Sequence, residues 1–236
     1  MRLVKKTRSL CPECLSVIEA SLVEDNGRLL IKKTCEKHGD FEDVYWSNYD
    51  DYIKAMSWYT QGTKLANPRT KGEKGCPYDC GICDNHKSHT VLAIIDLTTR
   101  CNLNCPICFA SANNPEVPYI YEVSTEQAKG MIDNLASNKP IPPRALQFSG
   151  GEPTLRDDLP ELIRYAKDRG IHHVEVNTNG LRLANDMDYF KRLVEAEVST
   201  LYLSFEGVTP KPYIANKGRD LLDIKLRVLE NSRRVG

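Results

Sequence analysis

The stretch VLAIIDLTTRCNLNCPIC, residues 91–108, sets an apolar run directly before three cysteines. The run VLAIIDL predicts a buried strand, so the cysteines fall on the loop that follows it. Further along the chain, strand-like segments alternate with amphipathic, helix-like segments. The predicted strands cover residues 91–97, 145–151, 172–180 and 200–207, and the predicted helices cover residues 124–136, 158–170, 186–197 and 220–234. Four consecutive βα units predict an α/β fold with a parallel sheet.

The three cysteines after the first predicted strand are Cys101, Cys105 and Cys108, with the spacing C-x3-C-x2-C. Thiols so close together in a chain without an export signal indicate metal ligands. A cubane [4Fe–4S] cluster has four irons that each need an outer ligand, and ferredoxins supply four thiolates. Because this run supplies three, it would leave one iron open to the donor atoms of a small molecule.

Glycines and polar residues follow the other three predicted strands. They are Gly150, Gly151 and Glu152 after the second strand, Asn177 and Asn179 after the third, and Ser204 and Glu206 on the fourth. Each segment alone has an ordinary explanation, since Gly-Gly-Glu-Pro and Asn-rich segments are common in turns. In βα barrels, however, the carboxyl ends of the strands form the active site. We therefore expect these groups to converge around the cysteine loop.

The combination of C-x3-C-x2-C after the first strand and GGEP after the second resembles the radical S-adenosylmethionine (SAM) superfamily. The resemblance implies an incomplete parallel (β/α) partial barrel, a [4Fe–4S] cluster, SAM, and a reduced ferredoxin or flavodoxin as electron donor. In the family, SAM is cleaved to methionine and a 5′-deoxyadenosyl radical that abstracts hydrogen from a substrate. The resemblance implies that Cys101, Cys105 and Cys108 ligate the cluster. It implies that Gly150, Gly151 and Glu152 contact the methionine amino group of SAM and that Ile107 contacts its adenine. Ser204 and Glu206 would contact the ribose or carboxylate of SAM, and Asn177 and Asn179 are weaker candidates for SAM binding.

A second C-x3-C-x2-C triplet, Cys76, Cys80 and Cys83, precedes the first predicted strand. It cannot occupy the same place at the carboxyl ends of the strands, and we interpret it as an auxiliary [4Fe–4S] cluster. The fourth ligand would be His86, His89, a cysteine of another chain, or a substrate. A zinc knuckle is the structural alternative.

Residues 1–46 predict a small metal-binding β ribbon. Asn26-Gly27, between two alternating segments, is a strong hairpin signal. The hairpin would return Cys35 and His38 to Cys11 and Cys14, a ligand set that suits zinc or a rubredoxin-like iron. Residues 47–89 then hold a helix, a polar linker and the auxiliary triplet, and residues 90–236 form the core.

The complete cysteine pattern is similar to that of the archaeal tetraether lipid synthase group, which includes dihydropterin methyltransferases of methanogens. That similarity implies radical C–C bond formation on a lipid or small-molecule substrate. We expect coupling of lipid chains, and methylation of a pterin is the alternative.

The composition limits the other function classes. The 236 residues include 32 basic and 32 acidic side chains, so nothing predicts a nucleic-acid partner. No apolar run is long enough to cross a membrane and no signal peptide is recognisable. Together with the closely spaced thiols, this predicts a reducing, oxygen-poor cytoplasm. Two non-catalytic alternatives are a ferredoxin-like electron-transfer module and a zinc-stabilised scaffold.

The number of βα units leads to a further expectation. The resemblance implies six barrel strands, and four are recognisable. We therefore expect a fragment, completed by a missing C-terminal region or a second polypeptide. Alone, it would expose an open strand edge, a known aggregation hazard.

Overall fold

The computed structural model describes residues 1–60, 62–74, 79, 81–114, 116 and 121–235. The chain divides into two compact units, Met1–Gln61 and Gly62–Gly236, and each is described by itself. Within the described residues, no helix has the length and apolar character needed to cross a membrane.

The first unit is a four-stranded antiparallel sheet followed by one helix. Its strands are β1 (Arg2–Leu10), β2 (Val17–Asp25), β3 (Arg28–Cys35) and β4 (Gly39–Trp46), in that spatial order, and the helix is α1 (Tyr49–Ser57). The predicted hairpin is present: Asn26 and Gly27 both have positive φ, and Asp25 pairs with Arg28 across the turn. The sequence prediction contained only the central hairpin, and the structure adds an outer strand on each side of it.

The second unit contains a parallel sheet with helices between its strands, which confirms the predicted α/β fold. Strands β5 (Leu92–Thr98), β6 (Ala145–Gly150), β7 (His173–Thr178) and β8 (Thr200–Leu203) lie in that order. The predicted helices are α2 (Thr125–Ala136), α3 (Leu159–Asp168), α5 (Met187–Glu195) and α7 (Leu222–Val235). Three short helices were not predicted: η1 (Pro153–Leu155), α4 (Leu181–Asn185) and α6 (Pro210–Lys217).

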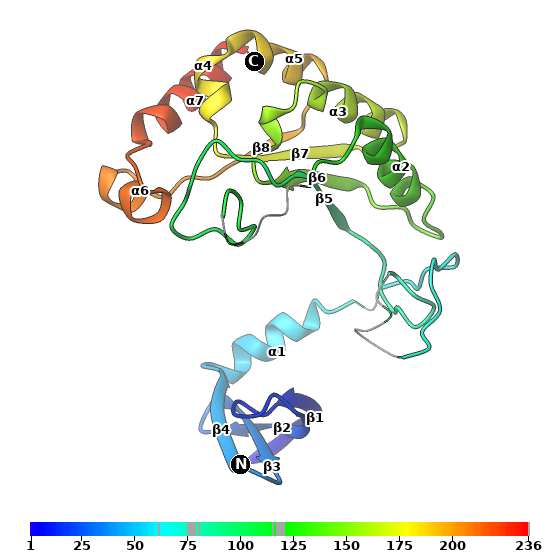
Figure 1. Cartoon of the computed structure of the whole chain (residues 1–236). Helices are drawn as coiled ribbons and strands as arrows, with labels where there is room; N and C mark the ends of the chain where they lie inside the picture. The colour runs from blue at the N-terminus through cyan, green and yellow to red at the C-terminus, as the bar shows by residue number, and fades with distance from the viewer. Residues whose placement is uncertain (61, 75–78, 80, 115, 117–120, 236) are drawn as a thin grey trace. The chain divides into compact units, whose positions relative to one another are not determined.

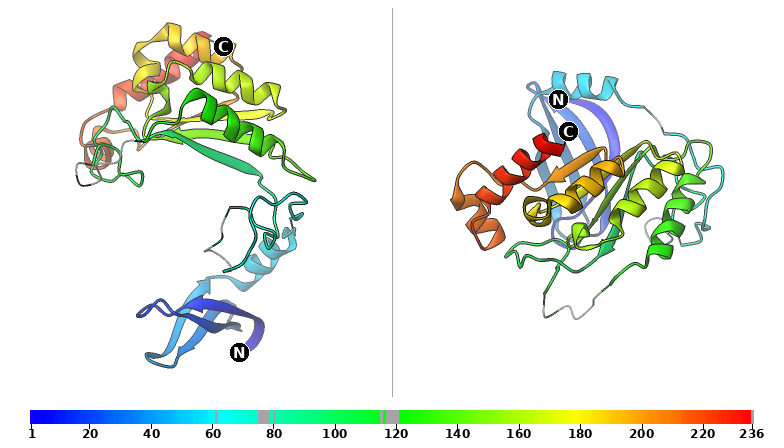
Figure 2. Two further views of the ribbon diagram at one scale, coloured as in Figure 1. Left: turned by 45° about the vertical axis from the view of Figure 1, so that its right-hand side comes forward. Right: turned by 90° about the horizontal axis from the view of Figure 1, so that it is seen from above.

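The helices of the second unit cover one face of its sheet (Figures 1 and 2). The core on that side includes Leu146, Phe148, Val174 and Val176, all fully buried. Alternate residues point to the other face, where the side chain of Ile94 is 59% exposed. The strand predicted at residues 91–97 is present as β5, but it is buried on one face, because helices pack against only that face in the described part of this unit.

Candidate active site

One cavity of about 280 Å³ lies at the carboxyl ends of the parallel strands. Among the residues named from the sequence, it is lined by Cys101, Cys105, Ile107, Cys108, Gly150, Gly151, Glu152, Asn177, Asn179 and Ser204. The sequence analysis did not name the other lining residues, Leu103, Phe109, Ala110, Thr178, Tyr202 and Lys217. All four strand ends contribute, so the fold gathers the three thiols and the polar groups around one space.

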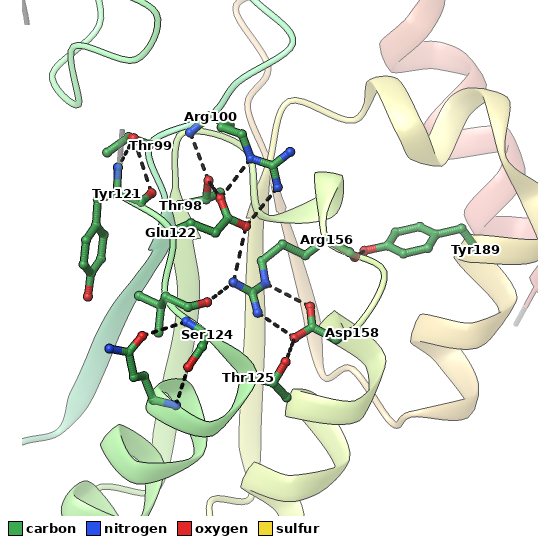
Figure 3. Close-up of polar contacts among 12 residues, drawn as sticks. Thr98, Thr99, Arg100, Tyr121, Glu122, Ser124, Thr125, Arg156, Asp158 and Tyr189 are labelled. Carbon is green, nitrogen blue, oxygen red and sulfur yellow. Dashed lines mark hydrogen bonds and ion pairs between the residues drawn. The ribbon is translucent and has the colours of Figure 1, made fainter. Parts of the chain in front are cut away.

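The ends of the cysteine loop are tied together by an ion pair (Figure 3). Arg100 donates from Nε and a terminal nitrogen to the two carboxylate oxygens of Glu122, each at 2.9 Å. The Thr98 hydroxyl donates to the same carboxylate at 2.5 Å. Arg156 reaches Glu122 from the other side and is paired with Asp158. This network fixes the backbone immediately before Cys101.

The Gly-Gly pair packs directly on the backbone of that loop. A Cβ at Gly150 would lie 2.3 Å from the carbonyl oxygen of Thr98, and one at Gly151 would lie 2.3 Å from the carbonyl oxygen of Arg100. The N–H of Gly151 donates to the Thr98 carbonyl at 2.6 Å. Any side chain at either position would push the cysteine loop away from β6, so the glycines serve the cluster loop as well as the cavity.

Glu152 has its carboxylate fully engaged by its own chain. Its side chain accepts hydrogen bonds from the N–H and hydroxyl of Thr154, the hydroxyl of Thr178 and the N–H of Asn179. The residue is only 1% exposed. Glu152 therefore joins the loops after β6 and β7, whereas the resemblance implied that it contacts SAM directly.

Asn179 links the cysteine loop to a buried lysine that the sequence analysis missed. Its Nδ2 donates to Oδ1 of Asn102 at 2.7 Å and lies 3.9 Å from Sγ of Cys101. Its carbonyl accepts from Nζ of Lys225 at 2.5 Å, and the same Nζ lies 3.3 Å from the Ser204 hydroxyl. Lys225 is 0% exposed, and burial lowers its pKa to about 8. The sequence offered one signal for this residue: Lys225 occupies a position on the face of α7 where the helical periodicity places apolar residues.

Ser204 and Glu206 lie beyond the end of β8, which corrects the prediction that the fourth strand carries them. Strand β8 ends at Leu203 because its pairing partner β7 ends at Thr178. Ser204 still lines the cavity. Glu206 instead pairs with Lys217 at 3.0 Å, and its buried Oε2 has no hydrogen-bond partner among the described residues.

The three thiols in the cavity are partly buried. Burial raises the pKa of both Cys101 and Cys105, so a metal bound by these thiols would have to displace their protons. In the described part of the chain, only the N-terminal ribbon brings three or more ligand atoms within 4.8 Å of one another. Ligation of a [4Fe–4S] cluster by Cys101, Cys105 and Cys108 stays a prediction.

The ribbon of the first unit forms a compact ligand set, as predicted. Cys11, Cys14, Cys35 and His38 bring one ligand atom each within 4.8 Å of the others. Nδ1 of His38 lies 3.5 Å from the sulfurs of both Cys11 and Cys35, and the sulfurs of Cys14 and Cys35 lie 3.9 Å apart. Zn–S bonds of about 2.3 Å in a tetrahedron separate sulfurs by about 3.8 Å. The ribbon residues therefore fit one tetrahedral ion.

The auxiliary triplet is only partly described. Cys76 and Cys80 lie outside the described residues. Cys83 is half-buried, and its backbone forms an isolated parallel β-bridge with that of Thr70. Of the two candidate fourth ligands, His86 lies 3.2 Å from the hydroxyl of Ser88 and His89 lies 3.1 Å from that of Thr63. The auxiliary cluster stays a prediction.

Comparison with known proteins places the chain in a family. The model of the radical SAM superfamily matches residues 95–236, and the model described as the HMPTM N-terminal zinc ribbon domain matches residues 3–47. The chain therefore belongs to the radical SAM superfamily, whose members use a [4Fe–4S] cluster and SAM, and it carries an N-terminal zinc ribbon.

Individual proteins of known name show how similar the chain is to particular members of this superfamily. The chain is 52% identical over 233 residues, 98% of its length, to 7,8-dihydro-6-hydroxymethylpterin dimethyltransferase of Methanocaldococcus jannaschii, and covers 45% of that protein. It is 37% identical over 153 residues, 64% of its length, to Fe-coproporphyrin III synthase of Methanosarcina barkeri, and covers 36% of it. Among solved structures, methylornithine synthase matches with a TM-score of 0.49 and 17% identity over 63% of this chain and 43% of the other. The chain thus spans less than half the length of these relatives.

Proposed function

We propose that this chain forms the SAM-cleaving part of an enzyme that abstracts hydrogen from a dihydropterin and methylates it. The observation that carries the proposal is the cavity in which three thiols meet the ends of four parallel strands. The name of the 52% identical relative supports a pterin substrate, so we favour this alternative over the coupling of lipid chains.

When bound, the cluster would supply the electron for reductive cleavage of SAM to methionine and a 5′-deoxyadenosyl radical. Cys101, Cys105 and Cys108 would hold it. An electron transferred from a ferredoxin- or flavodoxin-type donor is part of the proposal. An auxiliary cluster at the upstream triplet is also proposed.

The surrounding residues would position SAM through groups that the chain leaves available. Ser204 lines the cavity with a hydroxyl that Lys225 contacts. Glu206 is not among the lining residues, and its buried Oε2 would accept from a ribose hydroxyl if binding of SAM exposed it. The side chain of Ile107 is 75% exposed on the cavity, where an adenine ring would bury it. A buried acceptor without a donor costs free energy, so a ligand hydroxyl at Glu206 would offset that cost.

The test measures transfer of deuterium from the substrate to 5′-deoxyadenosine, and not the amount of methylated product. Anaerobically prepared, reduced protein would be incubated with SAM and 7,8-dihydro-6-hydroxymethylpterin deuterated at its carbon-bound positions. Deuterium in 5′-deoxyadenosine is the expected result. SAM cleavage without transfer from the pterin, but with transfer from a deuterated isoprenoid lipid, would favour the lipid reaction. Iron content without any cleavage of SAM would favour an electron-transfer module.

A further inference from the structure

The face of the parallel sheet that the helices leave open continues into the candidate active site. Strand register places two rows of side chains on this face: Ile94, Gln147, Glu175 and Thr200 in one row, and Asp96, Ser149, Asn177 and Tyr202 in the next. Asn177 and Tyr202 also line the cavity that holds the three thiols. A ligand on the open face would therefore lie directly beside the place where SAM is proposed to be cleaved.

The two rows are rich in hydrogen-bond acceptors. Nε2 of Gln147 donates to Oε1 of Glu175, and Nδ2 of Asn177 donates to Oγ of Ser149 at 3.2 Å. These bonds use amide nitrogens as donors, so the amide oxygens of Gln147 and Asn177 take no part in them. The other oxygen of Glu175 lies 3.9 Å from Nε2 of His173 in the adjoining row. The side chain of Asp96 is exposed, and its carboxylate forms no ion pair or hydrogen bond with any described residue.

Neither row contains a lysine or arginine. The carboxylates of Glu175 and Asp96 and the amide oxygens of these rows therefore favour a ligand that brings N–H donors. A hydrocarbon chain on this face would bury the Glu175 carboxylate, whose side chain is still 15% exposed, without a new donor, which is unfavourable. A planar heterocycle with adjacent ring N–H and amino groups offers a carboxylate two parallel hydrogen bonds.

We propose that Glu175, with Gln147 beside it on β6, binds the amino-pyrimidinone edge of the pterin substrate, and that Asp96, in the next row on β5, supplies a second acceptor on the same face. This inference rests on the proposed function and assigns residues that determine its substrate specificity. Glu175 accepts from the ring N–H and the exocyclic amino group. Tyr202, 59% exposed in the neighbouring row, provides an aromatic surface for the ring. The opposite end of the pterin then points along the strands toward the cysteine loop.

The experiment measures equilibrium binding of 7,8-dihydro-6-hydroxymethylpterin to the cluster-loaded full chain with SAM present. A second probe is the analogue with an oxo group in place of the 2-amino group, which lacks the exocyclic donor. The variants are Glu175→Gln and Asp96→Asn. Glu195→Gln is the matched control, because this substitution makes the same chemical change as Glu175→Gln, but on the exposed surface of α5.

The wild-type protein is expected to bind the amino compound at least about tenfold more tightly than the oxo analogue, because the unpaired acceptor disfavours the analogue. Glu175→Gln should weaken binding of the amino compound at least about tenfold and remove most of that preference. Asp96→Asn should weaken it less, and Glu195→Gln should leave it unchanged.

Unchanged affinity and preference in both Glu175→Gln and Asp96→Asn would overturn the inference and leave the proposed function intact. Equal weakening of both probes by Glu175→Gln, with a native circular dichroism spectrum, would also overturn it. Should Glu175→Gln fail to fold, Asp96→Asn decides by the same comparison. Wild-type protein that cleaves SAM but binds neither probe would instead remove the proposed pterin function.

Discussion

The side-chain carboxylate of Glu152 accepts the backbone N–H of Asn179 at 2.7 Å, and so joins the loop after β6 to the loop after β7. Asn179 in turn contacts Asn102 within the cysteine loop. The backbone N–H of Glu152 itself donates to the carbonyl of Arg100 at 2.8 Å. Through their backbone and side-chain groups, Glu152 and Asn179 thus connect three of the strand ends around the cavity.

Replacing Glu152 with glutamine should lower the free energy of unfolding by about 1 to 3 kcal/mol, because an amide NH2 cannot accept and would face buried donors. SAM affinity should fall as well, since the Asn179 loop loses its anchor. Urea denaturation and SAM binding by the loaded protein check both effects. Glu195→Gln is the control, and a variant as stable as that control would contradict the role of Glu152.

Replacing Cys105 with alanine should abolish formation of 5′-deoxyadenosine, because two thiols cannot hold the cluster. The N-terminal metal should remain, since its four ligands lie in a separate compact unit. Chromatography of the nucleoside and elemental analysis of the purified protein provide the readouts. Cleavage of SAM at the wild-type rate would exclude Cys105 as a cluster ligand.

The Glu122 carboxylate should stabilise the protein in a pH-dependent way. The hydrogen bond from Arg100 lowers the pKa of Glu122 below its ordinary value of 4.5. Its contribution is therefore complete above about pH 5 and is lost as the pH falls through the lower folded-state pKa. Because the side chain is 36% exposed, the contribution should be below about 1 kcal/mol.

The measurement compares wild type with Glu122→Gln by urea denaturation from pH 7 to pH 3. The difference in unfolding free energy should be largest at neutral pH, should shrink below pH 4.5, and should decrease with added salt. A difference that grows on acidification would show that the ion pair does not stabilise the loop.

Lys225 should add a second rise of stability with pH, in the alkaline range. Burial lowers its pKa from 10.5 to about 8. Between these values the unfolded chain binds more protons than the folded chain, so stability should rise with pH across that window. Lys225→Met should remove this rise and should also weaken SAM binding, because Asn179 and Ser204 lose their shared donor.

Thermal unfolding from pH 7.5 to pH 10 tests the first effect and SAM binding tests the second. Lys211→Met is the control, because Lys211 is exposed at the start of α6. An alkaline rise of equal size in the wild type and Lys225→Met would show that another group is responsible.

Removing the ribbon metal should unfold the first unit and spare the second. Metal binding contributes on the order of 10 kcal/mol to such sites. Cys35→Ser should release one metal ion per chain and abolish amide-exchange protection in β2 and β3, while protection in β6 persists as the internal reference. Unchanged protection in the ribbon after loss of metal would show that its small core of Leu22, Leu29 and Tyr52 suffices.

Much of the fold and of the candidate site followed from local sequence patterns. Strand and helix periodicity predicted the four βα units, because backbone preferences and side-chain alternation act over a few residues. The Asn26-Gly27 turn was equally local, and it was enough to bring Cys35 and His38 back to the first two cysteines. The thiol spacing and the GGEP segment are local as well, and it was their resemblance to the motifs of the superfamily that indicated the chemistry.

Only the tertiary structure decided how the polar side chains are used. Glu152 and Asn179 are 27 residues apart in sequence, and Lys225 and Asn179 are 46 apart, so neither contact has a local signal. The length of β8 depended on where β7 ends, which moved Glu206 off the strand and onto Lys217. The open face with Asp96 and Glu175 likewise arose because the helices cover one side of the sheet. Hydrogen bonding and burial are satisfied between distant segments, so they become known only when those segments pack together.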